Sequence, residues 1–357
     1  MFYREAGQFK TTYQGDQAVF PILQDKIAVL IVIALAYMVP LIANEYWLQA
    51  VLIQFLIFAL MAIGLNILMG YAGQISLGTG AFAAVGAYAC YKLTTNIEGM
   101  NIVVAILLSG GVAAAVGVLF GLPSLRIKGF YLAVATLAAQ FFILWLFNKV
   151  GWFYNDNPSG TITAPPRELF GIAVTGPKAT PEARYWLCLT FLVVFAWLAK
   201  NLVRGRIGRS WMAIRDMDIA AELIGIKPLP TKLSAFAVSS FYCGVAGVLW
   251  SFCYINTVEA TAFDIFRSFS VLFMVIIGGL GSILGCFLGA FFIFLLPIFL
   301  NSAPGWVGLE VPTELISHLE FMVFGALIVF FLIVEPHGLA RLWSITKEKL
   351  RLWPFPY

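Results

Sequence analysis

Long apolar runs, separated by short polar stretches, dominate this chain from residue 27 to residue 334. A helix needs about 20 predominantly apolar residues to cross a bilayer, and most of the runs approach that length. The third run is rich in Gly and Ala and the eighth is short, so each is a candidate for a broken or re-entrant helix. The pattern predicts an all-α integral membrane protein, a polytopic bundle of about 8–10 transmembrane helices, some short or broken. The ten runs cover residues 27–43, 48–69, 75–92, 101–122, 130–148, 185–199, 233–255, 268–280, 282–300 and 316–334.

A polar interruption between Lys200 and Lys232 breaks this pattern, with seven basic and three acidic residues. Ser210 is a suitable N-cap, and Gly225 followed by Pro228 is a common helix stop. We therefore expect one short amphipathic helix over residues 210–225. Its apolar face rests either on lipid headgroups or in a groove of a soluble ATPase, and the spacing alone favours neither. The residues spaced to form that face are Trp211, Ile214, Met217, Ala221 and Ile224.

The composition excludes several classes of protein. Hydrophobic residues make up 61% of the chain and charged residues 11%, whereas soluble domains are about 25% charged. The net charge of +4 is too small to indicate a nucleic-acid partner. All five cysteines lie in apolar runs without a CxxC or Cys/His spacing, so we interpret them as packing residues and expect no metal site.

The distribution of Lys and Arg indicates the orientation, because these residues accumulate in cytoplasmic loops. With the amino terminus inside and ten alternating crossings, 16 of the 22 Lys and Arg residues fall on the inner side. This predicts that both termini are cytoplasmic. The expected organisation is a cytoplasmic N-terminal segment (1–25), a transmembrane domain (26–340) with an inner loop (200–232) and an outer loop (149–184), and a cytoplasmic C-terminal tail (341–357).

Several signatures of chemistry are absent from the sequence. No predicted span carries Asp, Glu, Lys or Arg at its centre. A charge costs about 2.5–3.5 kcal/mol there on insertion scales, and ion-coupled carriers retain such groups, so their absence disfavours an ion-driven mechanism. The sequence has no GxxxxGK[ST] phosphate loop and no HExxH metal motif. We therefore expect no catalytic residue, no enzymatic activity and no cofactor bound by this chain.

Glycines mark two further segments. Residues 70–82 read GYAGQISLGTGAF, and unwound backbone at membrane depth is tolerated where protein or a water-filled cavity covers it. This segment either packs against its neighbours or lines a translocation path. Residues 278–282 read GGLGS, for which we favour a tight turn, and a doubled GxxxG pattern next to it favours close helix packing. The candidate path residues are Gly73, Gln74, Ser76, Gly78 and Thr79, and the candidate packing residues are Gly281, Gly285 and Gly289.

Several blocks of the sequence resemble one family. AIRDMDIAAELIGI (213–226) resembles the cytoplasmic loop of bacterial ABC-importer permeases. Four more blocks are similar to the LivM-type subunit of high-affinity branched-chain amino acid permeases, and they occur in the same order. They are GYAGQISLG (70–78), PSLRIKGFYLAVATLA (123–138), MVIIGGLGSILGCFLGA (274–290) and EPHGLARL (335–342).

The resemblance implies an importer of several chains in a bacterial inner (plasma) membrane. A second permease subunit would form a heterodimer with this one, two cytoplasmic ATPases would bind ATP and Mg²⁺, and a periplasmic binding protein would deliver the substrate. It also implies that the loop 200–232 couples to an ATPase. The candidate coupling residues are Arg215, Asp216, Asp218, Ala220, Ala221, Glu222 and Gly225.

Two departures from the family pattern bear on the substrate. Family members commonly have His where this chain has Thr79, and a TGG-x-x-GL stretch where this chain has NPSGTITAPP (157–166). The family carries branched-chain amino acids, and some members carry urea, short amides or aromatic acids, so these substrates stay open. Outside the family, the alternatives are an ion-coupled secondary transporter of small organic solutes and a passive channel.

Overall fold

The computed structural model describes residues 9, 11–12, 15, 23–124, 131–306, 313–334 and 338–352. Most of the predicted N-terminal segment lies outside the described residues, as do His337 and residues 353–357. The helices are α2 (Leu23–Met38), α3 (Glu45–Trp47), α4 (Gln54–Asn66), α5 (Thr79–Asn96), α6 (Ile102–Ser124), α7 (Tyr131–Lys149), α8 (Gly151–Tyr154), α9 (Pro181–Arg204), α10 (Arg206–Asp216), α11 (Asp218–Leu223), α12 (Pro228–Leu249), α13 (Ile265–Gly278), α14 (Ile283–Trp306), α15 (Thr313–Val334) and α16 (Gly338–Leu352).

Short elements extend or join these helices. Three π-helical turns continue α3, α4 and α12, namely η2 (Leu48–Ile53), η3 (Ile67–Tyr71) and η4 (Trp250–Ile255). Two 3₁₀ turns of the described chain extend membrane segments: η1 (Val39–Leu41) follows α2, and η5 (Ala260–Phe263) precedes α13. Strand β1 (Ile162–Thr163) pairs antiparallel with β4 (Thr257–Val258), with Ile162 opposite Val258. Strand β2 (Glu168–Leu169) pairs antiparallel with β3 (Ile172–Ala173), with Glu168 opposite Ala173.

Eight helical segments of the described chain are long and apolar enough to cross a membrane. They are 24–41, 47–71, 102–123, 132–149, 181–204, 228–255, 260–278 and 283–302. This confirms the predicted all-α polytopic fold, with a span number at the lower end of the predicted range. Two of the ten runs are not among these eight segments. The third run forms α5, a continuous helix whose hydropathy is lower than that of the eight segments, and the tenth run lies in α15. The eighth run, which looked short, belongs to a full-length segment because η5 precedes α13.

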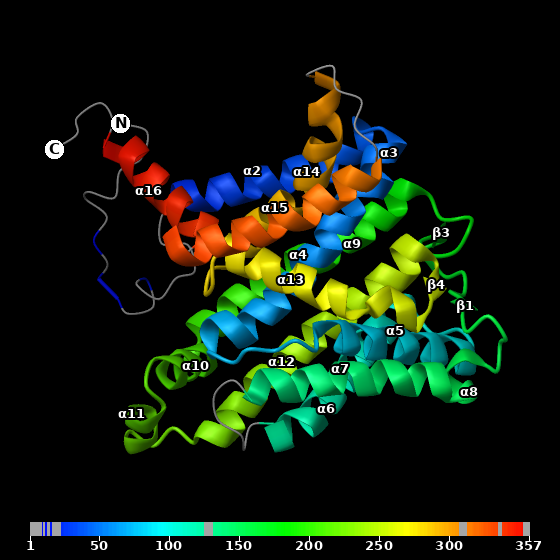
Figure 1. The fold of residues 1–357 in the computed structure, drawn as a ribbon, viewed down its shortest axis with the longest axis horizontal. Helices are drawn as coiled ribbons and strands as arrows, with labels where there is room; N and C mark the ends of the chain where they lie inside the picture. Colours follow the sequence, from blue (N-terminus) through cyan, green and yellow to red (C-terminus); the bar gives the residue numbers. More distant parts are fainter. Residues whose placement is uncertain are drawn as a thin grey trace.

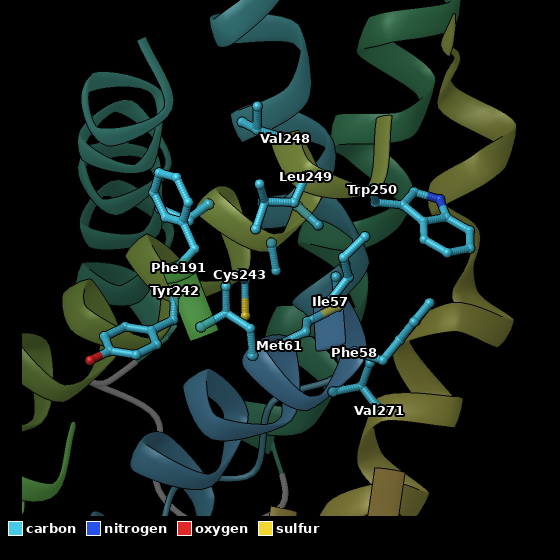
Figure 2. Packing of buried hydrophobic residues seen from close by; sticks show 14 of the residues in the cluster. Ile57, Phe58, Met61, Phe191, Tyr242, Cys243, Val248, Leu249, Trp250 and Val271 are labelled. Carbon is cyan, nitrogen blue, oxygen red and sulfur yellow. The ribbon is translucent and has the colours of Figure 1, made fainter. Parts of the chain in front are cut away.

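The centre of the bundle is built by the two spans that contain α4 and α12. In the most apolar 18 residues of each span, the buried share is 83% for span 47–71 and 72% for span 228–255, against 6% for span 24–41. Figure 2 shows α4 side chains packed between α12 and α13 in this core. Phe58 of α4 meets Trp250 edge-on, with ring centroids 4.9 Å apart. Helices α5 and α6 pack on the other side of α12, so α12 is enclosed on several faces.

Local sequence signals explain where several helices begin and end. Thr180 caps α9 by accepting a hydrogen bond from the Ala183 amide, with Pro181 at the first helical position. Asp264 caps α13 in the same way through the Arg267 amide. The predicted GGLGS turn is present, since α13 ends at Gly278, α14 begins at Ile283, and Gly279 and Gly281 have positive φ angles.

The loops gather at two opposite ends of the bundle (Figure 1). At one end, here called the hairpin end, Arg167 donates to the Thr94 carbonyl, Lys92 Nζ lies 2.6 Å from Asn155 Oδ1, and β1 pairs with β4. At the other, the α10 end, α10 approaches Gly70 and the turn between α13 and α14. The predicted outer loop 149–184 and the predicted inner loop 200–232 lie at these opposite ends, and their assignment to the two sides of the membrane stays a prediction.

The loop 200–232 contains two helices, so the prediction of one helix over 210–225 is wrong. Helix α10 ends at Asp216, Met217 is extended (φ −160°, ψ 97°), and α11 starts at Asp218. An acidic residue in the first turn of α11 suits the positive end of its helix dipole. Ser210 is not an N-cap, because it lies inside α10 and its hydroxyl donates to the Arg206 carbonyl. Gly225 does end the second helix, with φ +90°.

Candidate coupling and translocation site

Helix α10 is anchored to the bundle by its apolar side. Trp211 is fully buried, Ile214 is 5% exposed, and the Trp211 indole N–H donates to Ser234 Oγ of α12 at 2.9 Å. Gly208 approaches the backbone of Val203 at the end of α9 so closely that a Cβ there would collide with it. Because α10 is tied to both α9 and α12, a force applied to it reaches two membrane spans.

Helix α11 turns most of its apolar side chains away from the protein. Only Ala221 is buried, at 2% exposed. Met217 and Ile224, which the spacing placed on the buried face, are exposed, because the extended Met217 breaks the helix and redirects the chain after it. The exposed fractions are 65% for Met217, 70% for Ile219, 84% for Leu223 and 75% for Ile224, and these four residues are here called the α11 patch.

Charged residues surround the α11 patch. Asp218 lies 4.0 Å from Lys232 Nζ, and Glu222 and Asp216 are exposed. Ala220 is half-buried, and Gly225 is exposed at the end of the helix. Arg215 differs from the other predicted coupling residues, because its guanidinium points to the bundle and donates to the Gly70 carbonyl at 2.7 Å. The α11 patch is therefore an exposed apolar surface with charged residues at its border.

The Gly-rich segment is unwound between two helices. The span that contains α4 ends with η3 at Tyr71, residues 72–78 are not helical, and α5 begins at Thr79. Gly73 has φ +67°, a conformation in which glycine is favoured, and the Gln74 amide donates back to the Leu68 carbonyl. The interruption that the glycines indicated at Gly70–Phe82 is therefore present.

Most of the predicted path residues are buried in this structure. Gln74 is 3% exposed, Ser76 and Thr79 are each 2% exposed, Gly78 is buried, and Gly73 is exposed. The Gln74 side-chain amide and the Thr79 hydroxyl have no hydrogen-bond partner in the described part of the chain. Buried polar groups without partners are rare, since each costs about 1–3 kcal/mol. Their role in translocation stays a prediction.

The first turn of α5 lies at membrane depth and is capped by other helices. The Gly80 amide donates to Ser268 Oγ of α13 at 2.9 Å, and the Ala81 amide donates to Gln140 Oε1 of α7 at 2.6 Å. Thr136, one turn earlier on α7, accepts from the Leu77 amide. Gln140 lies in the middle of the span 132–149, so α5 begins inside the bundle. Such a helix terminus among polar groups resembles the binding elements of discontinuous transporter helices.

The three glycines of the doubled GxxxG pattern lie in two different environments. Gly285 and Gly289 face the backbone of α13, where a Cβ would collide with Gly278 and Met274. Gly281 is not helical, since it lies in the turn before α14 with φ +76°. It contacts Gly70 and receives a cap from Asn66, whose Oδ1 accepts from the Gly281 amide at 2.9 Å.

Sequence reasoning missed several polar residues that organise this region. Asn66, Thr136, Gln140 and Ser268 are buried and hydrogen-bonded. All four are uncharged polar residues inside predicted spans, and that was the signal available, because a polar side chain in a span needs a partner. The exposed Ile219 and Leu223 were missed because apolar spacing was interpreted as a buried face.

A separate cavity of about 360 Å³ lies between α6 and α9 beneath the β2–β3 hairpin. Apart from Thr190, its lining is apolar, with Leu107, Trp186 and Phe191 among its residues. An amino acid zwitterion needs hydrogen bonds to its charged groups, and this cavity offers almost none. The unwound segment is therefore the better candidate for contact with a polar solute.

Comparison with known proteins identifies the family. The family model described as "Branched-chain amino acid transport system / permease component" matches residues 47–332. The high-affinity branched-chain amino acid transport system permease protein LivM of Salmonella typhimurium is 30% identical over 320 residues, which cover 83% of this chain and 70% of the relative. A probable branched-chain amino acid transport permease protein LivM of Methanocaldococcus jannaschii is 24% identical, over 81% of this chain and 92% of the relative. No solved structure matches. On the matches to the family model and to LivM, this chain belongs to the family of branched-chain amino acid transport permeases.

Proposed function

We propose that this permease imports branched-chain amino acids, or related small amino acids and amides, as one subunit of an ABC transporter. The α10 end faces the cytoplasm, where two ATPase subunits bind ATP and Mg²⁺. A second permease subunit completes the membrane part as a heterodimer, and a periplasmic binding protein delivers the substrate. The relatives named for branched-chain amino acid transport support the substrate class.

The α11 patch is the observation that carries the proposal. Four large apolar side chains on and beside a six-residue helix have little contact with the rest of the chain. Burying one such side chain contributes about 1.5–3 kcal/mol, so a groove on an ATPase that received the patch would gain much of its affinity there. The anchored α10 would then pass the movement of the ATPases to α9 and α12, and the ligand would move because the two states bind it differently.

Substitutions in the α11 patch test this docking. Placing Asp at Ile219 and Leu223 together leaves the buried Trp211 and Ala221 unchanged, so the chain keeps its fold, and the charges oppose burial. We expect the ATPase subunits to be lost when the complex is purified through this chain. The matched control is Phe170→Asp, another exposed apolar residue (97%) at the hairpin end, which should retain the ATPases. Normal co-purification of the double variant would contradict docking at α11.

The energy source and the substrate need separate measurements. Uptake that persists when the proton and sodium gradients are dissipated at constant ATP supports the importer, and uptake that stops indicates an ion-coupled carrier. Calorimetry with the partner binding protein decides the substrate. Binding of leucine, isoleucine and valine supports branched-chain amino acids, whereas binding of only urea, short amides or aromatic acids selects those substrates instead.

A further inference from the structure

Arg215 lies in the last turn of α10, beside the α11 patch, but its side chain reaches in the opposite direction. Its Nη1 donates to the Gly70 carbonyl oxygen at 2.7 Å, and its Nε and Nη2 each lie 2.9 Å from Asp216 Oδ1. Hydrogen bonds from a charged donor are about twice as strong as neutral ones. The neighbouring carboxylate holds the guanidinium in the position from which it reaches Gly70.

The acceptor of this hydrogen bond is the end of a membrane span. Gly70 belongs to η3, and the last carbonyls of a helix have no partner within the helix. A cation at this end also suits the negative pole of the helix dipole. Arg215 therefore supplies a cap that the span 47–71 does not provide for itself.

Two further glycines, Gly73 and Gly281, lie close to the Arg215 side chain. A Cβ on Gly73 would lie 2.8 Å from Arg215 Cγ and 3.4 Å from its Cα, so the stem of the side chain and the α10 backbone lie directly on the unwound segment. A Cβ on Gly281 would lie 3.5 Å from Arg215 Nη1. One side chain thus touches the end of η3, the start of the unwound segment and the turn between α13 and α14.

The same segment ends at the capped first turn of α5. Between Gly73 and Gly78 there is no helix, and Leu77, Gly80 and Ala81 are held by side chains of α7 and α13. A displacement of α10 that pulls on Gly70 and Gly73 therefore reaches buried polar groups at membrane depth through the non-helical chain 72–78.

We infer that Arg215 is a positioning residue that links α10 to the unwound segment 72–78, and that it does not serve as an ATPase contact. This inference rests on the proposed function, since the movement it transmits is that of ATPases docked on α11. Arg215 would make the segment move together with α10 as the transporter changes state. Its loss would separate ATP hydrolysis from transport while leaving docking intact.

The test uses the complete transporter in proteoliposomes with its binding protein, and it measures both transport and ATP hydrolysis. Arg215→Met keeps the stem and removes the donors. Transport per ATP hydrolysed should fall by about tenfold, the change expected on losing a hydrogen bond to a charged group, while ATPase co-purification is retained. Arg215→Lys, which keeps one donor, should restore part of it. Arg209→Met, which removes an exposed charge from the same helix, should behave like the unchanged protein.

Three outcomes would overturn the inference. Unchanged transport per ATP in Arg215→Met would show that the link is unnecessary. Loss of the ATPases from that variant would make Arg215 a docking residue. Equal loss in Arg209→Met would reduce the effect to one of charge. Failure of the unchanged protein to bind any ATPase would instead contradict the proposed function, and it is distinguishable because no variant is involved.

A distance measurement distinguishes loss of the link between α10 and the unwound segment from misfolding of the Arg215→Met variant. Spin labels at Arg209 of α10, outside the α11 patch, and at Ile75, both exposed, report the separation of α10 from the unwound segment. In the unchanged protein this distance should stay constant between the nucleotide-free and ATP-trapped states. In Arg215→Met it should differ between the two states, and a distance that remains constant there would contradict the link.

Discussion

Gly86 of α5 and Gly244 of α12 bring two helix backbones into direct contact. A Cβ at Gly86 would collide with the Gly244 carbonyl group, and a Cβ at Gly247 would collide with the backbone of Ala83. The sequence predicted that small residues at helical spacing pack helices together, because lipid gives no hydrophobic drive for helix association. It did not identify the partners, since spacing along one helix carries no information about the helix opposite.

The close contact predicts unequal effects of the same substitution at two glycines. Gly86→Ala should destabilise the protein by about 1–3 kcal/mol, the usual cost of overpacking. Gly111→Ala, in α6 with no atom within 4 Å of its Cβ, should be neutral or stabilising by about 0.5–1 kcal/mol, because alanine favours helix. The measurement is the thermal unfolding midpoint in detergent. Equal midpoints for the two variants would contradict the contact.

At the scale of elements, apolar runs located the spans well and their interruptions less well. The ten runs correspond to helices over most of their length, because bilayer thickness imposes a narrow range of lengths. The break at Met217 was not predictable from spacing, since Trp211, Ile214 and Ala221 are buried as a single helix would bury them. The capping of α5 by Gln140 and Ser268 joins residues about sixty and nearly two hundred positions apart, which no local pattern reveals.

This capping leads to a prediction about the stability of α5. Gln140 accepts from the Ala81 amide and donates to the Phe263 carbonyl, so Gln140→Leu leaves both groups without these partners. We expect a cost of about 1–3 kcal/mol and local opening of the first turn of α5. Hydrogen exchange should accelerate at residues 80–82 and remain unchanged in Gln49→Leu, where the glutamine is exposed. Unaltered exchange in the Gln140 variant would show that the cap is dispensable.

At the scale of the whole molecule, the loops form two groups at opposite ends, and the positive charge of the loop 200–232 predicts which end is cytoplasmic. The sequence therefore predicted the family and the polytopic helical bundle, and the orientation of the crossings stays a prediction. It could not predict what covers α2, because this depends on lipid and partner subunits. Only 6% of that span is buried, although Tyr185 and Trp186 of α9 donate to its last carbonyls and Tyr37 meets Thr190.

Cysteine labelling tests the orientation directly. Phe170→Cys at the hairpin end and Ile207→Cys at the α10 end, outside the α11 patch, replace side chains that are 97% and 50% exposed, while all five native cysteines are buried. A membrane-impermeant maleimide added to intact cells, with the outer membrane opened, should label Phe170→Cys. It should label Ile207→Cys only after the inner membrane is permeabilised. The reverse pattern would mean that the charge rule gives the wrong orientation here.

The unwound stretch 72–78 also determines what can surround the molecule. Backbone outside a helix cannot satisfy its own polar groups, and hydrocarbon cannot satisfy them either, so such backbone does not face lipid tails. Ile75 lies on this stretch and is 44% exposed, yet its apolar side chain does not make this a lipid-facing surface. Water or another polypeptide has to cover it. Among the lipids that surround this protein, none would have its acyl chains in contact with residues 72–78.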